Sequence, residues 1–332
     1  MTRSIFIIWR PAVAAATLAL FGWHGAASAA EQWNFYMHQS APNFATSRGA
    51  KLFTEQVEKA TNGELKIRLH LAGTLQINAS NITQAVGENV VQIGDDLFNS
   101  GNIAVAGIPR LPMLIQSYED FAKADAVLKP YIEKAFAQKG STVLASYTYP
   151  MQFVWGRKKL ESLDDIRGMK LRVAQPEQGE LVRRFGGVSI TMSAPEVPSA
   201  LDRGVVDGIF TAGVGAVLWK DLLKFGYVLI VNINNSYFIA NTDAYRKLSP
   251  ALQNQLRKAA EEAARWDQDT MKTEEADSVQ LLKSAGYTFT QARPDEIVRA
   301  VDAMKPYWDE WAKARGPEIV EALGKVRAAL GR

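Results

Sequence analysis

The 332-residue sequence contains no cysteine. Disulfide bonds and a thiol nucleophile are therefore excluded, and so is a lipid anchor, which requires a cysteine where the leader is cut. Histidine is scarce as well: His24, His38 and His70 occur at spacings that match no metal site. We expect no metal site and no bound cofactor.

The motifs of common catalytic sites are also missing. No Gly-x-Ser-x-Gly sequence occurs, which excludes the usual hydrolase nucleophile turn. The acidic pairs Asp164-Asp165 and Glu261-Glu262 are typical of solvated turns and helix faces. Gly213-Val214-Gly215 is similar to a dinucleotide-binding loop but lacks the third glycine. We predict no catalytic residues, and a secreted α/β enzyme acting on organic acids is the alternative of another class.

Charge of one sign is not in excess, since 38 basic residues face 35 acidic ones. Basic residues form only short clusters, such as residues 157–159 and 183–184. A nucleic-acid or membrane-surface partner would need a larger basic patch, so neither is expected.

The first 29 residues have the order of a secretory signal peptide. Arg3 and Arg10 supply positive charge, an apolar stretch follows, and Ala27-Ser28-Ala29 gives the small-residue cleavage pattern. The apolar stretch is too short and too rich in alanine for a good membrane anchor, although a retained N-terminal helix is the alternative. We expect export to the periplasm, cleavage near Ala29 and no direct membrane insertion.

Strand-like and helix-like segments alternate through most of the chain. Residues 65–71 alternate apolar and polar side chains, as a half-buried strand does, and apolar spacing over residues 42–60 is helical. After Ser249-Pro250 the apolar residues trace one face of a long helix. The pattern predicts an α/β fold with mostly parallel sheets, a strand over residues 205–210 and a helix over residues 216–223.

Four stretches resemble the DctP-type extracytoplasmic solute receptors of TRAP transporters. Residues 160–173, which read LESLDDIRGMKLRV, carry the most specific similarity. Residues 200–208 (ALDRGVVDG) resemble a second family element. The helix-to-strand joint at residues 58–67 and the segment at residues 239–250 add to it. In this order behind a signal peptide, they identify the chain as a member of that family.

The resemblance implies a two-lobed periplasmic binding protein fold with hinge strands and a long C-terminal bracing helix. We expect lobe 1 in residues 30–148 and lobe 2 in residues 149–234. A returning hinge strand, the long helix and C-terminal helices that pack on both lobes would occupy residues 235–332. Such receptors close around an organic acid and deliver it to the small and large membrane subunits of a TRAP permease. An ABC-type receptor would share this shape but not the motifs.

Arg172 matches the arginine with which the family binds a carboxylate, a task suited to a planar guanidinium. Many members present a second arginine after the strand that ends near Tyr147, where this chain has Gln152. Asp207-Gly208 is usually followed by Gln-Glu-Asn, whereas here Phe210 and Thr211 follow within three residues. The full set of expected ligand-binding residues is Arg172, Gln152, Thr211, Phe210, Trp155, Phe98 and Trp219.

One arginine, one glutamine and the apolar segment after Asp207-Gly208 favour a small 2-oxo or 2-hydroxy monocarboxylate as the ligand. The aromatic residues of the set are consistent with a ligand that has an aromatic or branched tail. A sugar acid and a C4-dicarboxylate are the alternative ligands. The sequence leaves open whether a cation takes part in binding and whether the protein is a monomer or a dimer.

Overall fold

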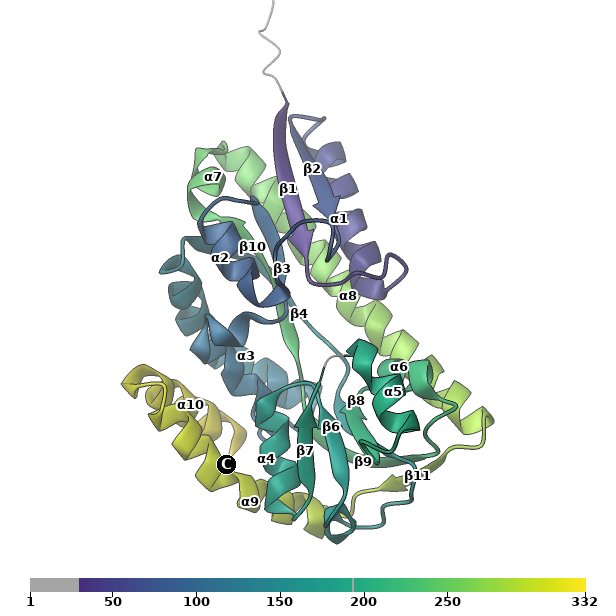
Figure 1. Ribbon diagram of the computed structural model, residues 1–332. Helices are drawn as coiled ribbons and strands as arrows, with labels where there is room; N and C mark the ends of the chain where they lie inside the picture. Colours follow the sequence, from purple (N-terminus) through teal and green to yellow (C-terminus); the bar gives the residue numbers. More distant parts are fainter. Residues whose placement is uncertain (1–29, 193) are drawn as a thin grey trace, which may run out of the picture.

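A computed structural model describes residues 30–192 and 194–332, which form two α/β lobes (Figure 1). The expected signal peptide lies outside the described residues. The first sheet has the strand order β2-β1-β3-β10-β4. Its strands are β1 (Glu31–Met37), β2 (Leu65–His70), β3 (Ile93–Asp96), β4 (Ser141–Thr148) and β10 (Asn235–Asn241).

The second sheet has the strand order β11-β9-β5-β8-β6-β7. Its strands are β5 (Gln152–Gly156), β6 (Lys170–Val173), β7 (Val188–Thr191), β8 (Gly208–Thr211), β9 (Phe225–Asn232) and β11 (Thr288–Gln291). The two-lobed α/β fold expected from the sequence is thereby confirmed.

Ten α-helices occur in the described residues and cover the faces of the two sheets. They are α1 (Ala45–Ala60), α2 (Ile82–Gly87), α3 (Tyr118–Ala137), α4 (Pro176–Arg184), α5 (Val197–Asp202), α6 (Gly213–Ala216), α7 (Thr242–Lys247), α8 (Pro250–Ser284), α9 (Pro294–Lys313) and α10 (Pro317–Leu330). None of these helices is long and apolar enough to span a lipid bilayer.

Two pairs of strands carry the chain between the sheets. β4 leads into β5 across residues 149–151, and β9 leads into β10 across residues 233–234. β10 is antiparallel to β3 and β4, and β5 is antiparallel to β8 and β9. Both sheets are therefore mixed rather than mostly parallel, because β10 in the first sheet and β5 in the second run antiparallel to both of their neighbours.

The long helix α8 runs along both lobes (Figure 1). It packs on α1 and β4 of the first lobe and on α6 of the second. Near its far end, the Glu275 carboxylate accepts hydrogen bonds from the backbone N–H groups of Gly213 (2.7 Å) and Val214 (2.9 Å). The bracing helix expected from the sequence is confirmed.

The helix predicted over residues 216–223 begins earlier than the apolar pattern suggests. α6 starts at Gly213, and a short 3₁₀ helix (Val217–Trp219) follows it. Glycine has a low helix propensity, so the two glycines of α6 gave no helix signal, but Glu275 satisfies the first N–H groups of α6 from a distant part of the chain. The strand predicted over residues 205–210, by contrast, begins later than expected, at Gly208.

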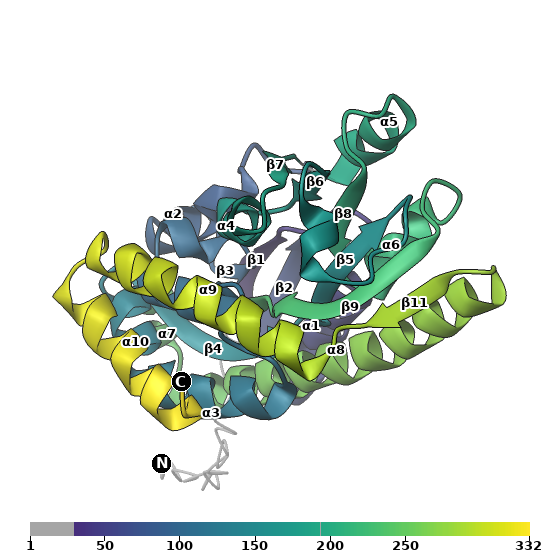
Figure 2. The same cartoon turned by 90° about the horizontal axis from the view of Figure 1, so that it is seen from below.

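The C-terminal helices bridge the two lobes. α9 packs on α4 of the second lobe, while α10 packs on α3 of the first, as Figure 2 shows. Trp308 is fully buried and its indole N–H donates to the carbonyl of Pro112 (2.8 Å). One apolar cluster consequently extends from Ile239 in the first sheet through Trp308 to Leu171 in the second.

Candidate functional site

Arg172 lies on strand β6, which is next to the edge strand β7 and pairs with β8 on its other side. Only 6% of the residue is exposed. Its Nε donates to the carbonyl of Met192 (3.1 Å) and its Nη1 to the carbonyl of Phe210 (3.3 Å). Nη2 has no hydrogen-bond partner among the described residues.

The charge of Arg172 is partly desolvated. Burial lowers its pKa to about 10, while the negative charge of Glu196 acts in the opposite direction. The group therefore keeps its positive charge at neutral pH. In the part of the chain that the structure describes, no carboxylate lies within ion-pair distance of it. A buried cation held by carbonyls is complemented best by an anion that arrives from outside.

Gln152 opens β5 at the crossing between lobes and is half-buried. Its Oε1 accepts a hydrogen bond from Nε2 of Gln178 in α4. The same Nε2 donates to Oδ1 of Asn232 (2.9 Å), at the end of β9. A chain of amides thus connects β5, α4 and β9 where the lobes meet.

Thr211 and Gln152 are linked through β5. Phe153, next to Gln152, is paired with Thr211 in β8. The carbonyl of Thr211 accepts a hydrogen bond from Nε1 of Trp155 (3.0 Å), and its hydroxyl faces Gly215 of α6 so closely that no Cβ atom would fit there. Thr211, Gln152 and Arg172 therefore lie on neighbouring strands of one sheet.

The four aromatic residues of the expected site differ in exposure. Trp155 and Phe210 are fully buried and Trp219 is 7% exposed. Their rings therefore pack inside the second lobe and offer little or no surface to a ligand in this structure. Phe98 lies on the other lobe and is 40% exposed. Its ring centroid is 6.1 Å from that of His38.

The chain matches the family described as "Bacterial extracellular solute-binding protein, family 7" over residues 36–314. The chain belongs to this family. The resemblance inferred from the sequence motifs is thereby confirmed, and the family is one of solute-binding receptors rather than enzymes.

Two curated relatives are similar over most of their length. The C4-dicarboxylate-binding periplasmic protein DctP of Rhodobacter capsulatus is 26% identical over 310 residues, which cover 88% of this chain and 90% of the relative. The sialic acid-binding periplasmic protein SiaP of Vibrio cholerae is 26% identical over 301 residues, covering 83% and 87%.

Solved structures share the fold. A Bordetella pertussis extracytoplasmic solute receptor binding pyroglutamic acid, DctP6, has a TM-score of 0.80 at 23% identity, with 91% of this chain and all of that chain covered. A TRAP periplasmic solute-binding protein from Roseobacter denitrificans with bound β-D-glucuronate has a TM-score of 0.79 at 21% identity, covering 90% and 99%.

A second buried arginine in this family 7 receptor, Arg110, lies beneath the crossing strands. It is 1% exposed and donates through Nη2 to the carbonyl of Asn235 (2.6 Å). Asp96 lies close enough to compensate its charge electrostatically. Burial raises the pKa of Asp96 to about 6, so this carboxyl is still largely ionised at pH 7. Arg110 offers almost no surface to a ligand.

A buried polar cluster adjoins the ends of β1 and β3. His38 contacts the Tyr149 hydroxyl through Nε2 (2.7 Å) and the Asp95 carbonyl through Nδ1 (3.2 Å). Asp95 accepts hydrogen bonds from Tyr147 (2.8 Å) and Ser236 (2.5 Å). This cluster orders the crossing segment at Tyr149. Among the described residues no group of three or more His, Cys, Asp or Glu could hold a metal ion.

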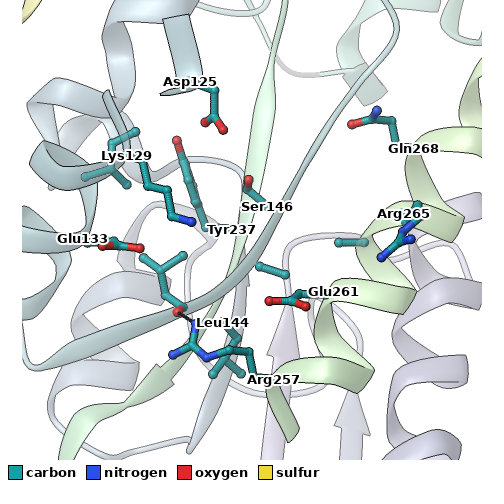
Figure 3. Close-up of a pocket in the computed structure, with 14 residues that line it drawn as sticks. Asp125, Lys129, Glu133, Leu144, Ser146, Tyr237, Arg257, Glu261, Arg265 and Gln268 are labelled. Carbon is teal, nitrogen blue, oxygen red and sulfur yellow. Dashed lines mark hydrogen bonds between the residues drawn. The ribbon is translucent and has the colours of Figure 1, made fainter. Parts of the chain in front are cut away.

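A pocket of about 360 Å³ lies elsewhere on the first lobe, between α3 and α8 beside β4 (Figure 3). Its charged lining residues are Asp125, Lys129, Glu133, Arg257, Glu261 and Arg265. Three acids and three bases give no net charge that would attract an anion, and Arg257 is already bonded to the carbonyl of Val143 (3.1 Å). None of the expected ligand residues lines this pocket.

Sequence reasoning missed Gln178 and Asn232, the fully buried amides that hold Gln152. The only local signal was the spacing of Gln175 and Gln178 at the start of α4, which form a capping box. That signal predicts a helix start, not a contact with a crossing strand.

Proposed function

We propose that this receptor holds one small carboxylate anion between its lobes, with Arg172 as the anion anchor. The observation that carries the proposal is the burial of the Arg172 guanidinium with no carboxylate within ion-pair distance among the described residues. Each charge-assisted hydrogen bond to the ligand would contribute about 1.5–3 kcal/mol. The carbonyl bonds of Nε and Nη1 fix the guanidinium plane, and Nη2 is the nitrogen best placed to receive the anion.

The ligand class that we propose is a 2-oxo or 2-hydroxy monocarboxylate with an apolar part. Arg110 is 1% exposed and offers almost no surface to a ligand, which leaves Arg172 as the buried arginine available to an anion near the crossing strands. Gln152 would donate to a second ligand oxygen, and the Thr211 hydroxyl is a further candidate contact. Phe98 would supply the apolar contact, while Trp155, Phe210 and Trp219 would pack behind the residues that face the ligand.

The relatives support the anion and leave the rest of the ligand open. C4-dicarboxylates, sialic acid, pyroglutamate and glucuronate, which the compared proteins bind, all carry a carboxylate. A sugar acid or a C4-dicarboxylate is therefore the second candidate ligand. The neutral Gln152 favours the monocarboxylate, because a dicarboxylate would bring two charges to one available arginine.

Delivery to a TRAP permease with small and large membrane subunits follows from membership of this receptor family, and is part of the proposal. So is export to the periplasm with cleavage near Ala29, a site outside the described residues.

A thermal-shift screen tests the ligand class, because a compound that binds the native state raises the melting temperature. The set should include 2-oxo and 2-hydroxy acids with branched and aromatic tails, pyroglutamate, glucuronate, sialic acid and succinate. We expect the largest shift from a 2-oxo or 2-hydroxy monocarboxylate, with calorimetry giving one site. Shifts from succinate or glucuronate alone would replace this ligand class with the second candidate.

A further inference from the structure

The orientation of the Gln178 side chain is fixed by two backbone groups. Gln178 is fully buried, and its Oε1 accepts hydrogen bonds from the backbone N–H groups of Ala174 (2.9 Å) and Gln175 (3.3 Å). A backbone N–H can only donate. The carbonyl end of the Gln178 amide must therefore face residues 174–175, and its NH₂ end must face the opposite way.

This orientation determines that of Gln152. The NH₂ group of Gln178 meets Oε1 of Gln152 and Oδ1 of Asn232, and only acceptors can satisfy it. Asn232 in turn directs its own NH₂ group to Oδ1 of Asn234 (3.3 Å). Because its oxygen is engaged, Gln152 presents its NH₂ group to the remaining side.

We propose that Gln178 is a specificity-determining positioning residue, which holds Gln152 as a donor so that the receptor selects an acceptor oxygen next to the ligand carboxylate. The inference rests on the proposed function in one respect, the contact between Gln152 and the ligand. A 2-oxo group can only accept a hydrogen bond, whereas a 2-hydroxy group can accept or donate. In the wild type, the NH₂ group of Gln152 can donate to either group. If the Gln152 amide were reversed, its oxygen could accept a hydrogen bond only from the hydroxyl of the 2-hydroxy acid.

The variant Gln178→Glu reverses the amide. A carboxylate can still accept from the N–H groups of Ala174 and Gln175, but it has no proton for Gln152. Gln152 must then turn its NH₂ group toward residue 178 and its oxygen toward the ligand. We expect affinity for 4-methyl-2-oxopentanoate to fall about tenfold or more, and affinity for 2-hydroxy-4-methylpentanoate to fall less.

Gln175→Glu is the matched control, because it adds the same charge at the same end of α4. The Gln175 side chain accepts from the backbone N–H of Gln178, and a carboxylate keeps that bond. Calorimetry should show equal losses for the two acids in this control. If Gln178→Glu binds the 2-oxo acid as the control does, or weakens both acids equally, the inference is wrong.

Gln178→Met covers the case in which a buried glutamate prevents folding. It keeps the side-chain length but neither orients Gln152 nor adds charge, so the 2-oxo acid should bind several-fold more weakly than to wild type. Wild-type affinity in this variant would overturn the inference.

Side-chain amide NMR separates the inference from the proposed function, since it needs no ligand. In the wild type, the NH₂ protons of Gln178 should exchange slowly with water and those of Gln152 rapidly. In Gln178→Glu the Gln152 protons should become protected. Protected Gln152 protons in the wild type would refute the positioning role, whereas failure of both acids to bind wild type would refute only the ligand class.

Discussion

The carboxyl of Asp267 in α8 occupies the space into which a side chain at Gly49 of α1 would project. A Cβ atom built on Gly49 would overlap Oδ1 of Asp267. Asp267 is fully buried, so its carboxyl has little room to move. This contact sets how closely the bracing helix approaches the first lobe.

Gly49→Ala should therefore destabilise the protein by about 1–3 kcal/mol, as overpacking of a tight core does. The better helix propensity of alanine, worth up to about 1 kcal/mol, would offset part of this loss. Denaturant unfolding gives the difference. Gly324→Ala in α10 is the matched control, because nothing lies within 4 Å of a Cβ there, and it should stabilise slightly. Equal effects of the two substitutions would contradict the packing argument.

The pH dependence of stability should contain a contribution from Asp267. Burial, and next the negative charge of Asp95, raise the pKa of Asp267 to about 9, while Arg48 acts in the opposite direction. The native state holds this proton more tightly than the unfolded chain, in which the pKa is about 3.9. The stabilisation is complete below about pH 4 and is lost as the pH rises toward 9.

Asp267→Asn removes this titration. Relative to wild type, the variant should gain stability with rising pH, with a limiting slope of about 1.4 kcal/mol per pH unit between pH 5 and 8. Urea unfolding at several pH values measures the difference in unfolding free energy between the variant and wild type. Asp96, whose pKa is also raised, titrates in both proteins, so most of its contribution cancels in this difference. Parallel stability curves for the two proteins would show that Asp267 does not hold a proton in the native state.

Glu275→Gln should loosen the attachment of α8 to the second lobe. The two carboxylate oxygens serve two backbone donors, and an amide offers only one oxygen. We expect a loss of about 1–3 kcal/mol in unfolding free energy. Glu274→Gln, which removes an exposed ion pair with Arg48 (2.6 Å), should cost less than about 1 kcal/mol. A control that costs as much as Glu275→Gln would argue against the capping role.

Arg172→Lys should weaken ligand binding about tenfold or more, because lysine keeps the charge but lacks the planar fork. Arg172→Ala should abolish detectable binding while the fold is retained. Calorimetry with the best ligand of the screen measures both. Arg183→Lys, an exposed position paired with Glu180 on the same lobe, should bind as wild type does. Unchanged affinity in Arg172→Ala would remove the anion anchor from the proposal.

The sequence predicted regular elements well where local pattern decides them. Residues 65–71 alternate, and β2 forms there. Element ends that depend on distant partners were missed, as at α6, whose start relies on Glu275 some 62 residues away. β5 went unpredicted because its residues are nearly all buried and show no alternation.

The same distinction applies to the site. Arg172 was found because it lies within a motif, whereas the donor orientation of Gln152 depends on Gln178, Asn232 and the backbone of residues 174–175. No sequence pattern specifies the direction in which an amide faces, since that follows only from the groups that the fold brings around it.

The several passages of the chain between the lobes restrict the ways in which the lobes can move. Two strand connections and α8 run from one lobe to the other. The helices α9 and α10 form a further bridge, which is packed around the buried Trp308. Parallel tethers resist twisting and sliding far more than they resist bending about a line through their shortest segments. The lobes should therefore approach each other along a single path, so that Phe98 on the first lobe meets the same part of the second lobe at every closure.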